Sequence, residues 1–234
     1  MVGRTSSTML EDGGPTVLAD APRTPADRGL RRLPHGRHGL SRRTVENQQR
    51  GRILRATVDT VATHGYERTC VDLIISAAGV SRRTFYHLYQ DKEDSFLAAH
   101  ADAQRVLLDR LAAALAGADP ADRSARLTAL VAALLDAAVE DPAATHVCLA
   151  DIVALGAEGL ALREVTTGPL REAMAQGEQA PTALAAEIAV GGFCGVVRSA
   201  IRDGWVATLP DRLPDLVDWV AQGRPPVPHI CCGV

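Results

Sequence analysis

Apolar side chains recur at helical spacing along most of the chain from about residue 46 to residue 222. The clearest stripe runs from Leu127 to Ala138, with apolar residues at i, i+3, i+4, i+7, i+8 and i+11. Another predicted helix begins near Thr44, as its N-cap, and ends at Gly65. Further helices are expected at about 70–78, 82–89, from Asp91 or Asp94 onward, 144–156, 158–176 (broken or kinked at Gly168-Pro169), 182–204 and 211–222. Aromatic residues make up only 3% of the chain, so the pattern predicts an all-α fold.

The tightest turn signal lies between two of the shortest predicted helices, in the sequence Ala78-Gly79-Val80-Ser81. Gly79 can adopt the positive φ that a sharp turn requires, and Ser81 can cap the helix that follows. Val80 can fill the space between the crossing helices. This arrangement is typical of a helix-turn-helix unit.

Composition and charge divide the chain into four expected segments. Residues 1–45 are rich in Gly, Pro and Arg, which favours a disordered basic arm. We expect a helix-turn-helix domain over 46–92, a second helical domain over 93–222, and a flexible tail over 223–234. Residues 22–92 carry 14 Lys and Arg against 6 Asp and Glu, whereas residues 102–234 carry 10 against 17. The first region is therefore suited to a polyanion and the second is not.

Several classes of protein fit the sequence poorly. No uninterrupted apolar run is long enough for a membrane span and no signal peptide is recognisable, so a cytoplasmic protein without membrane attachment is expected. Common catalytic and nucleotide-binding motifs are absent, which argues against an enzyme, and we expect neither a cofactor nor a bound metal. The five cysteines lack metal-type spacing. A thiol or metal sensor built on Cys70, or on Cys231 and Cys232, stays open as an alternative.

Within residues 82–89 the side chains divide between two faces. Phe85 and Tyr89 lie one turn apart and are expected in the core. The outward side chains include two arginines, whose guanidinium groups can bond guanine in the major groove. Lys92, the single lysine of the chain, follows the helix where a cation can contact the DNA backbone.

The order of these motifs resembles the TetR-type family of bacterial transcriptional regulators. The resemblance covers about residues 46–100, through Thr63-His64-Gly65-Tyr66, Ala77-Ala78-Gly79-Val80-Ser81, Thr84-Phe85-Tyr86 and Lys92-Glu93. It implies a homodimer that binds a double-stranded DNA operator and is released by a small effector, here expected to be apolar. It also implies that residues 93–222 form the effector-binding and dimerisation domain. The positions that match the family's DNA contacts are Arg52, Ser81, Arg82, Arg83, Thr84, Tyr86, His87 and Lys92. Asp72 departs from the family, which often has a basic or small polar residue at this DNA-facing position.

Two further sets of residues are candidates for the second domain. Apolar side chains that could line an effector pocket, or simply form the core, are Leu108, Leu111, Leu134, Cys148, Ile152, Leu155, Met174 and Phe193. By resemblance, the last two helices form the dimer interface, with candidates Gly191, Gly192, Gly195, Leu213, Leu216, Val217 and Val220. The sequence thus predicts a repressor controlled by a ligand; the alternatives are a DNA-binding regulator without an effector and a thiol-responsive or metal-responsive regulator.

Overall fold

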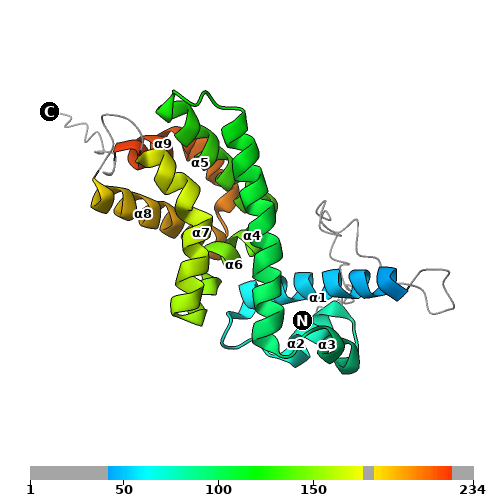
Figure 1. The fold of residues 1–234 in the computed structure, drawn as a ribbon. Helices are drawn as coiled ribbons and strands as arrows, with labels where there is room; N and C mark the ends of the chain where they lie inside the picture. The colour runs from blue at the N-terminus through cyan, green and yellow to red at the C-terminus, as the bar shows by residue number, and fades with distance from the viewer. Residues whose placement is uncertain (1–41, 176–181, 223–234) are drawn as a thin grey trace, which may run out of the picture. The chain divides into compact units, whose positions relative to one another are not determined.

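The computed structural model describes residues 42–175 and 182–222, and all regular structure in these ranges is helical. The predicted arm and tail lie almost wholly outside them. The first three helices are α1 (Arg42–His64), α2 (Val71–Ala78) and α3 (Arg82–Leu88). They form the helix-turn-helix domain, and Figure 1 shows α4 (Lys92–Ala116) as one unbroken helix that follows them.

The turn between α2 and α3 has the predicted geometry. Gly79 adopts the left-handed conformation, with φ 60° and ψ 40°, and closes α2. The Ser81 hydroxyl accepts a hydrogen bond from the backbone N–H of Thr84 at 3.0 Å, which satisfies a free donor at the start of α3. A non-glycine residue at position 79 would strain this turn, because L side chains rarely adopt positive φ.

A small core holds these helices together. Ile53 of α1, Ile74 of α2 and Phe85 of α3 are fully buried, and Tyr89 follows α3 into the same cluster. The predicted inward face of residues 82–89 is therefore confirmed. The outward face of α3 is fixed as a consequence, because its inward face is anchored on two other helices.

The C-terminal helical domain comprises the helices from α4 onward. It contains α5 (Arg123–Glu140), α6 (Pro142–Leu149), α7 (Ala157–Met174), α8 (Ala183–Arg202) and α9 (Leu213–Gln222). Three short 3-10 segments connect them, at Asp151–Leu155, Val206–Thr208 and Pro210–Arg212. The α5 stripe is buried as predicted, and it packs in one cluster with the inner faces of α4, α7, α8 and α9.

A second cluster joins the two domains through α6. Val58 and Tyr66 of the helix-turn-helix domain pack with Phe96 at the start of α4 and with Val147 of α6. Arg55 of α1 also forms an ion pair with Asp141, the residue between α5 and α6. The position of α6 is thus linked to that of α1 by apolar and charged contacts.

Three helix boundaries or breaks differ from the sequence prediction. Helix α1 begins at Arg42, so Thr44 lies in its first turn and is not its cap. The helix expected at 144–156 begins at Pro142 and ends at Leu149, because the backbone of Ala150 leaves helical values and a 3-10 turn follows. No interruption occurs at Gly168-Pro169, since α7 continues through both residues.

Contacts on both sides hold α7 across its internal proline. The Gln104 amide of α4 donates hydrogen bonds to the Leu162 carbonyl and the Thr166 hydroxyl, each at 2.8 Å. On the other side, the Arg171 Nε donates to the Glu187 carboxylate of α8 at 3.1 Å. These tertiary contacts therefore compensate for the loss of the backbone hydrogen bond that Pro169 cannot donate.

Helix α8 is long and apolar enough to cross a membrane by length and composition alone. Seven of its side chains, including Phe193 and Val197, are buried against the other helices of the domain. The core of the domain therefore accounts for part of its apolar character.

Candidate DNA-binding site

The outward face of α3 presents a cluster of polar side chains to solvent. Arg82, Arg83 and His87 are exposed, and Tyr86 is 50% exposed although it is aromatic. The Ser81 and Thr84 hydroxyls lie 2.9 Å apart and share a hydrogen bond. The structure thus brings six of the eight predicted DNA contacts together at one helix and its N-cap.

Carboxylates from the other two helices contact this face. Asp72 near the start of α2 forms an ion pair with the Arg82 guanidinium. Glu46 of α1 lies 3.8 Å from the His87 Nε2 atom. Arg83 has no ion pair within the described ranges, so its charge is open to an anionic partner.

A polar groove of about 410 Å³ lies beside the recognition helix. It is lined by side chains of α1 and α3, namely Val45, Glu46, Gln49, Arg83, Thr84 and His87. Glu46 and Gln49 were not among the sequence-predicted site residues. Both are half-buried on α1 and belong to no sequence motif that would single them out.

The two remaining predicted contacts lie away from α3. Lys92 is half-buried; its Nζ donates to the Tyr66 carbonyl at 3.0 Å and lies 4.0 Å from the centre of the Tyr66 ring. In this structure the lysine therefore holds the loop after α1. Arg52 is half-buried on α1. Contact of these two residues with the DNA backbone stays a prediction.

Most of the predicted effector-binding residues lie in the packed core. Leu111, Leu134, Cys148, Met174 and Phe193 belong to one buried cluster, with Leu108 half-buried at its side. Ile152 and Leu155 belong instead to the cluster that joins the two domains. The sequence set is therefore split between two places in the structure.

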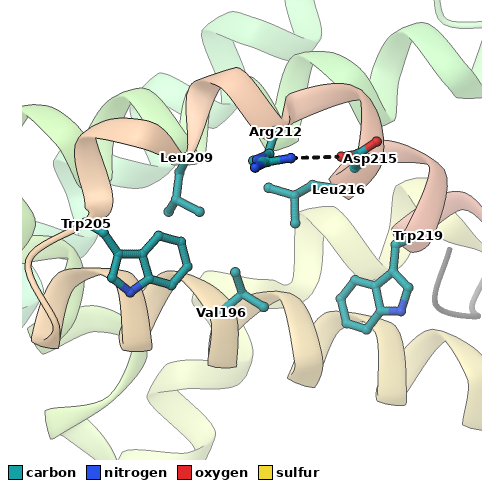
Figure 2. A pocket seen from close by; sticks show the side chains of 7 residues that line it. All are labelled: Val196, Trp205, Leu209, Arg212, Asp215, Leu216 and Trp219. Atoms are coloured by element: carbon teal, nitrogen blue, oxygen red, sulfur yellow. Dashed lines mark ion pairs between the residues drawn. The ribbon is translucent and has the colours of Figure 1, made fainter. Parts of the chain in front are cut away.

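An apolar pocket of about 410 Å³ lies elsewhere, between α8 and α9. Figure 2 shows Trp205 and Trp219 at its two ends, with Val196, Leu209 and Leu216 between them. An ion pair between Arg212 and Asp215, at 4.0 Å, marks one rim. Of these lining residues, only Leu216 was singled out from the sequence, as a dimer candidate. The sequence did contain a signal for this pocket, because Trp205 and Trp219 are the only two tryptophans of the chain.

The predicted dimer residues have unlike environments. A side chain added at Gly191 or Gly195 would meet nothing within 4 Å, so both face open space. At Gly192 an added Cβ would lie 2.0 Å from the Trp219 ring, so this glycine serves the packing of α9 on α8 within the chain. Leu213 and Leu216 are half-buried and Val217 is 7% exposed. The Val220 side chain lies outside the described part of the chain.

The cysteines of the described ranges are free thiols. Burial raises the pKa of the Cys148 thiol to about 12 and that of the Cys194 thiol to about 11. Cys70 is exposed at the N-cap of α2 and makes no side-chain capping hydrogen bond. High thiol pKa values disfavour thiolate chemistry at the two buried positions. Cys231 and Cys232 lie beyond the described residues.

An exposed recognition helix on a three-helix core, followed by an all-helical domain, is the arrangement of a DNA-binding protein of the helix-turn-helix class. Residues 53–99 match the family model for bacterial regulatory proteins of the tetR family. The helix-turn-helix part of the chain is thus similar to the DNA-binding domain of TetR-type regulators. No curated protein matches the chain in sequence.

Solved structures of TetR-type regulators share the fold over most of their length. The fatty acid degradation regulator FadR from Bacillus halodurans is 20% identical, with a TM-score of 0.65 over 74% of this chain and 94% of that chain. A TetR family regulator from Marinobacter aquaeolei is 23% identical, with a TM-score of 0.63 over 77% and 97%. FadR from Bacillus subtilis, solved in complex with stearoyl-CoA, is 16% identical, with a TM-score of 0.62 over 74% and 98%. At these identities the likeness establishes the fold.

Proposed function

We propose that this regulator is a cytoplasmic repressor that binds its operator as a homodimer and leaves it when a small apolar effector binds. The observation that carries the proposal is the outward face of α3, where exposed Arg82, Arg83, Tyr86 and His87 are held on a buried Phe85. A single helix of this kind fits the major groove, where its first residues meet base edges. The proposed domains remain 46–92 for DNA and 93–222 for the effector and the dimer.

The effector part of the proposal is supported by the composition of the second domain. Its core is almost wholly aliphatic, and the predicted set around Leu111, Leu134 and Phe193 lies at the centre of it. FadR from Bacillus subtilis was solved with stearoyl-CoA, a ligand with a long apolar chain. An apolar molecule could enter between these helices if they separate, because the residues that it would contact are apolar themselves.

The dimer part is supported by one face of α8. Leu184 and Ile188 are 71% and 59% exposed, and the open positions of Gly191 and Gly195 continue the same stripe at spacings of three and four residues. Large exposed apolar side chains beside glycines allow close approach of a second helix. A dimer also fits an operator with two half-sites one helical turn apart.

Footprinting on the DNA that flanks the protein's own coding region tests the proposal. We expect a protected two-fold symmetric site, whose protection is lost on replacement of both Arg82 and Arg83 with alanine at fixed salt. A panel of apolar small molecules, with long-chain acyl-CoA as the first probe, should then release the protein. Protection that survives the double replacement would contradict the assignment of the recognition helix.

A regulator without an effector is a second candidate, and a specific observation favours it. The predicted pocket residues Leu111, Leu134, Cys148 and Phe193 are each at most 2% exposed, and none of them lines the described pocket between α8 and α9. Operator binding that no member of a broad small-molecule panel alters, together with normal footprinting, would support this candidate over the ligand-controlled repressor.

A further inference from the structure

The negative charge of Asp72 is unexpected beside the recognition helix of a DNA-binding domain. It is the second residue of α2, its side chain is 64% exposed, and it forms an ion pair with Arg82, the first residue of α3. The left-handed turn at Gly79 makes this contact possible, because it brings the start of α3 back beside α2. The two side chains are ten positions apart in sequence, so the contact is a product of the turn.

Neither stability nor general DNA affinity accounts for this carboxylate. An ion pair between two side chains that are more than half exposed contributes about 0–1 kcal/mol to folding. A negative charge beside the recognition helix repels phosphate, which lowers the affinity for every DNA sequence. In the first turn of α2 the charge of Asp72 also interacts favourably with the helix dipole, by about 0.3–1 kcal/mol. These small gains in stability leave the cost in DNA binding largely unexplained and point to a further effect on its partner.

We propose that Asp72 is a specificity-determining residue that orients Arg82 toward a base edge in the major groove. This inference rests on the proposed DNA-binding function of α3. Asp72 accepts a hydrogen bond from the Arg82 Nη2 atom. Within the described ranges the Nε and Nη1 donors of Arg82 have no acceptor, so they remain available for the O6 and N7 acceptors of a guanine.

The ion pair has two effects on Arg82. It fixes a long, flexible side chain before DNA arrives, so less conformational freedom is lost on binding the correct base. It also offsets the charge of the guanidinium, so that Arg82 gains less from a non-specific phosphate contact. Both effects raise the ratio of specific to non-specific affinity.

Arg83 differs from Arg82 in having no acidic partner in the described part of the chain. It is the next residue of α3 and is exposed, yet it has no ion pair within the described ranges. Its charge is therefore open to any phosphate. On this proposal Arg82 reads a base while Arg83 contributes affinity that depends little on sequence.

The test compares the wild type with Asp72→Asn, Arg82→Lys and the control Asp109→Asn. Asp109 is also an exposed carboxylate paired with an arginine, Arg105, but lies on α4 outside the helix-turn-helix domain. Bound sequences are first selected by the wild-type protein from a pool of random double-stranded DNA. The affinity of each variant for the selected site and for unrelated DNA is then measured over a range of salt concentrations, and circular dichroism verifies that each variant is folded.

We expect Asp72→Asn to reduce the ratio of specific to non-specific affinity by roughly ten-fold, through tighter binding to unrelated DNA and loss of preference at one base pair. Arg82→Lys keeps the charge but not the planar fork, and should lose preference at the same base pair. Asp109→Asn should match the wild type. A folded Asp72→Asn variant with the wild-type ratio and base preference would overturn the role of Asp72. Failure of the wild type to select any sequence would instead overturn the proposed DNA-binding function and this inference with it.

Discussion

Gly191 and Gly192 are neighbours on α8 whose surroundings differ sharply. Gly191 faces open space, whereas Gly192 lies against the Trp219 ring. The sequence alone presents both as costly glycines in a helix. Only the packing of α9 shows that Gly192, unlike Gly191, must stay small for the fold of the chain itself.

Replacement of Gly192 with alanine should destabilise the fold. The new Cβ would lie 2.0 Å from the ring carbon Cη2 of Trp219, so either the indole must rotate out of its packing on α8 or α9 must move. We expect a loss of about 1–3 kcal/mol in the free energy of unfolding, measured by urea denaturation with tryptophan fluorescence. Gly168→Ala is the control, since a Cβ there would meet nothing within 4 Å, and it should be neutral or gain up to about 1 kcal/mol from helix propensity. Equal stability of the two variants would contradict this account of α9 packing.

His100 of α4 should make stability depend on pH. Its side chain is 1% exposed and its Nε2 atom has no hydrogen-bond partner within the described ranges. Burial lowers the pKa of His100 to about 4 from the usual 6.5. Between these values the unfolded chain binds a proton that the folded chain does not, so stability falls as the pH decreases from about 6.5 to about 4. Below both values the contribution changes no further.

The expected loss from His100 over this pH window is about 3 kcal/mol. Carboxylates titrate in the same window, so the free energy of unfolding is measured at pH 7 and pH 4.5 for the wild type and for His100→Leu. The variant removes the titrating group and fills the buried site with an apolar side chain of similar size. Its stability should fall less with pH than that of the wild type. Parallel losses in the two proteins would show that His100 is not the source.

At the scale of elements, α6 contacts the helix-turn-helix domain through α1, as α4 also does. The two oxygens of Asp141 have separate partners. Oδ1 accepts a hydrogen bond from the backbone N–H of Ala144 at 3.0 Å and caps α6, while Oδ2 accepts from Arg55 of α1. The Arg55 Nε also donates to Asp59 at 3.0 Å, which orients the guanidinium along α1. A displacement of α6 would therefore act directly on the helix-turn-helix domain.

A double-mutant cycle on Arg55 and Asp141 tests this connection. Asp141→Asn should keep the cap, because Asn and Asp cap helices equally well, but weaken the ion pair. We expect Arg55→Met and Asp141→Asn to show a coupling of about 0.5–1 kcal/mol in the free energy of unfolding, as for a partly exposed pair. Asp122→Asn is the control, since Asp122 caps α5 through the backbone N–H of Ala125 at 3.0 Å and forms no ion pair with α1 in the described part of the chain. Strict additivity would mean that the contact contributes nothing to the stability of the fold.

The sequence was most informative where a local rule determines the structure. Gly79 and Ser81 predicted the turn and the cap of α3, and the spacing of Phe85 and Tyr89 predicted its buried face. The break at Ala150 and the unbroken course of α7 past Pro169 were not predicted, because tertiary contacts decide both. The same holds for the site. The exposed arginines follow from helix periodicity, whereas the contacts of Glu46 with His87 and of Lys92 with Tyr66 depend on how separate helices pack.

At the scale of the whole molecule, two features bear on DNA binding: the opposite charges of the N-terminal and C-terminal regions, and the exposed apolar face of α8. The region that carries α3 is basic and the C-terminal region is acidic, so DNA should attract one end of the chain and repel the rest. One recognition helix of seven residues offers few base contacts. Two copies held together would combine their contacts, which can raise affinity by about 10²–10⁴-fold.

The proposed dimer therefore makes operator binding sensitive to a residue that never touches DNA. We expect the wild type to sediment as a dimer at micromolar concentration, and Ile188→Asp to shift it to monomer, because a carboxylate would be buried without a partner in the α8 face. Operator affinity should fall by about 100-fold or more as the two half-sites are bound independently. Val106→Asp is the control, since Val106 is 42% exposed on α4 and is not part of the α8 face. An Ile188→Asp variant that remains dimeric would place the interface elsewhere, whereas a monomer with undiminished operator affinity would show that DNA binding does not need the second copy.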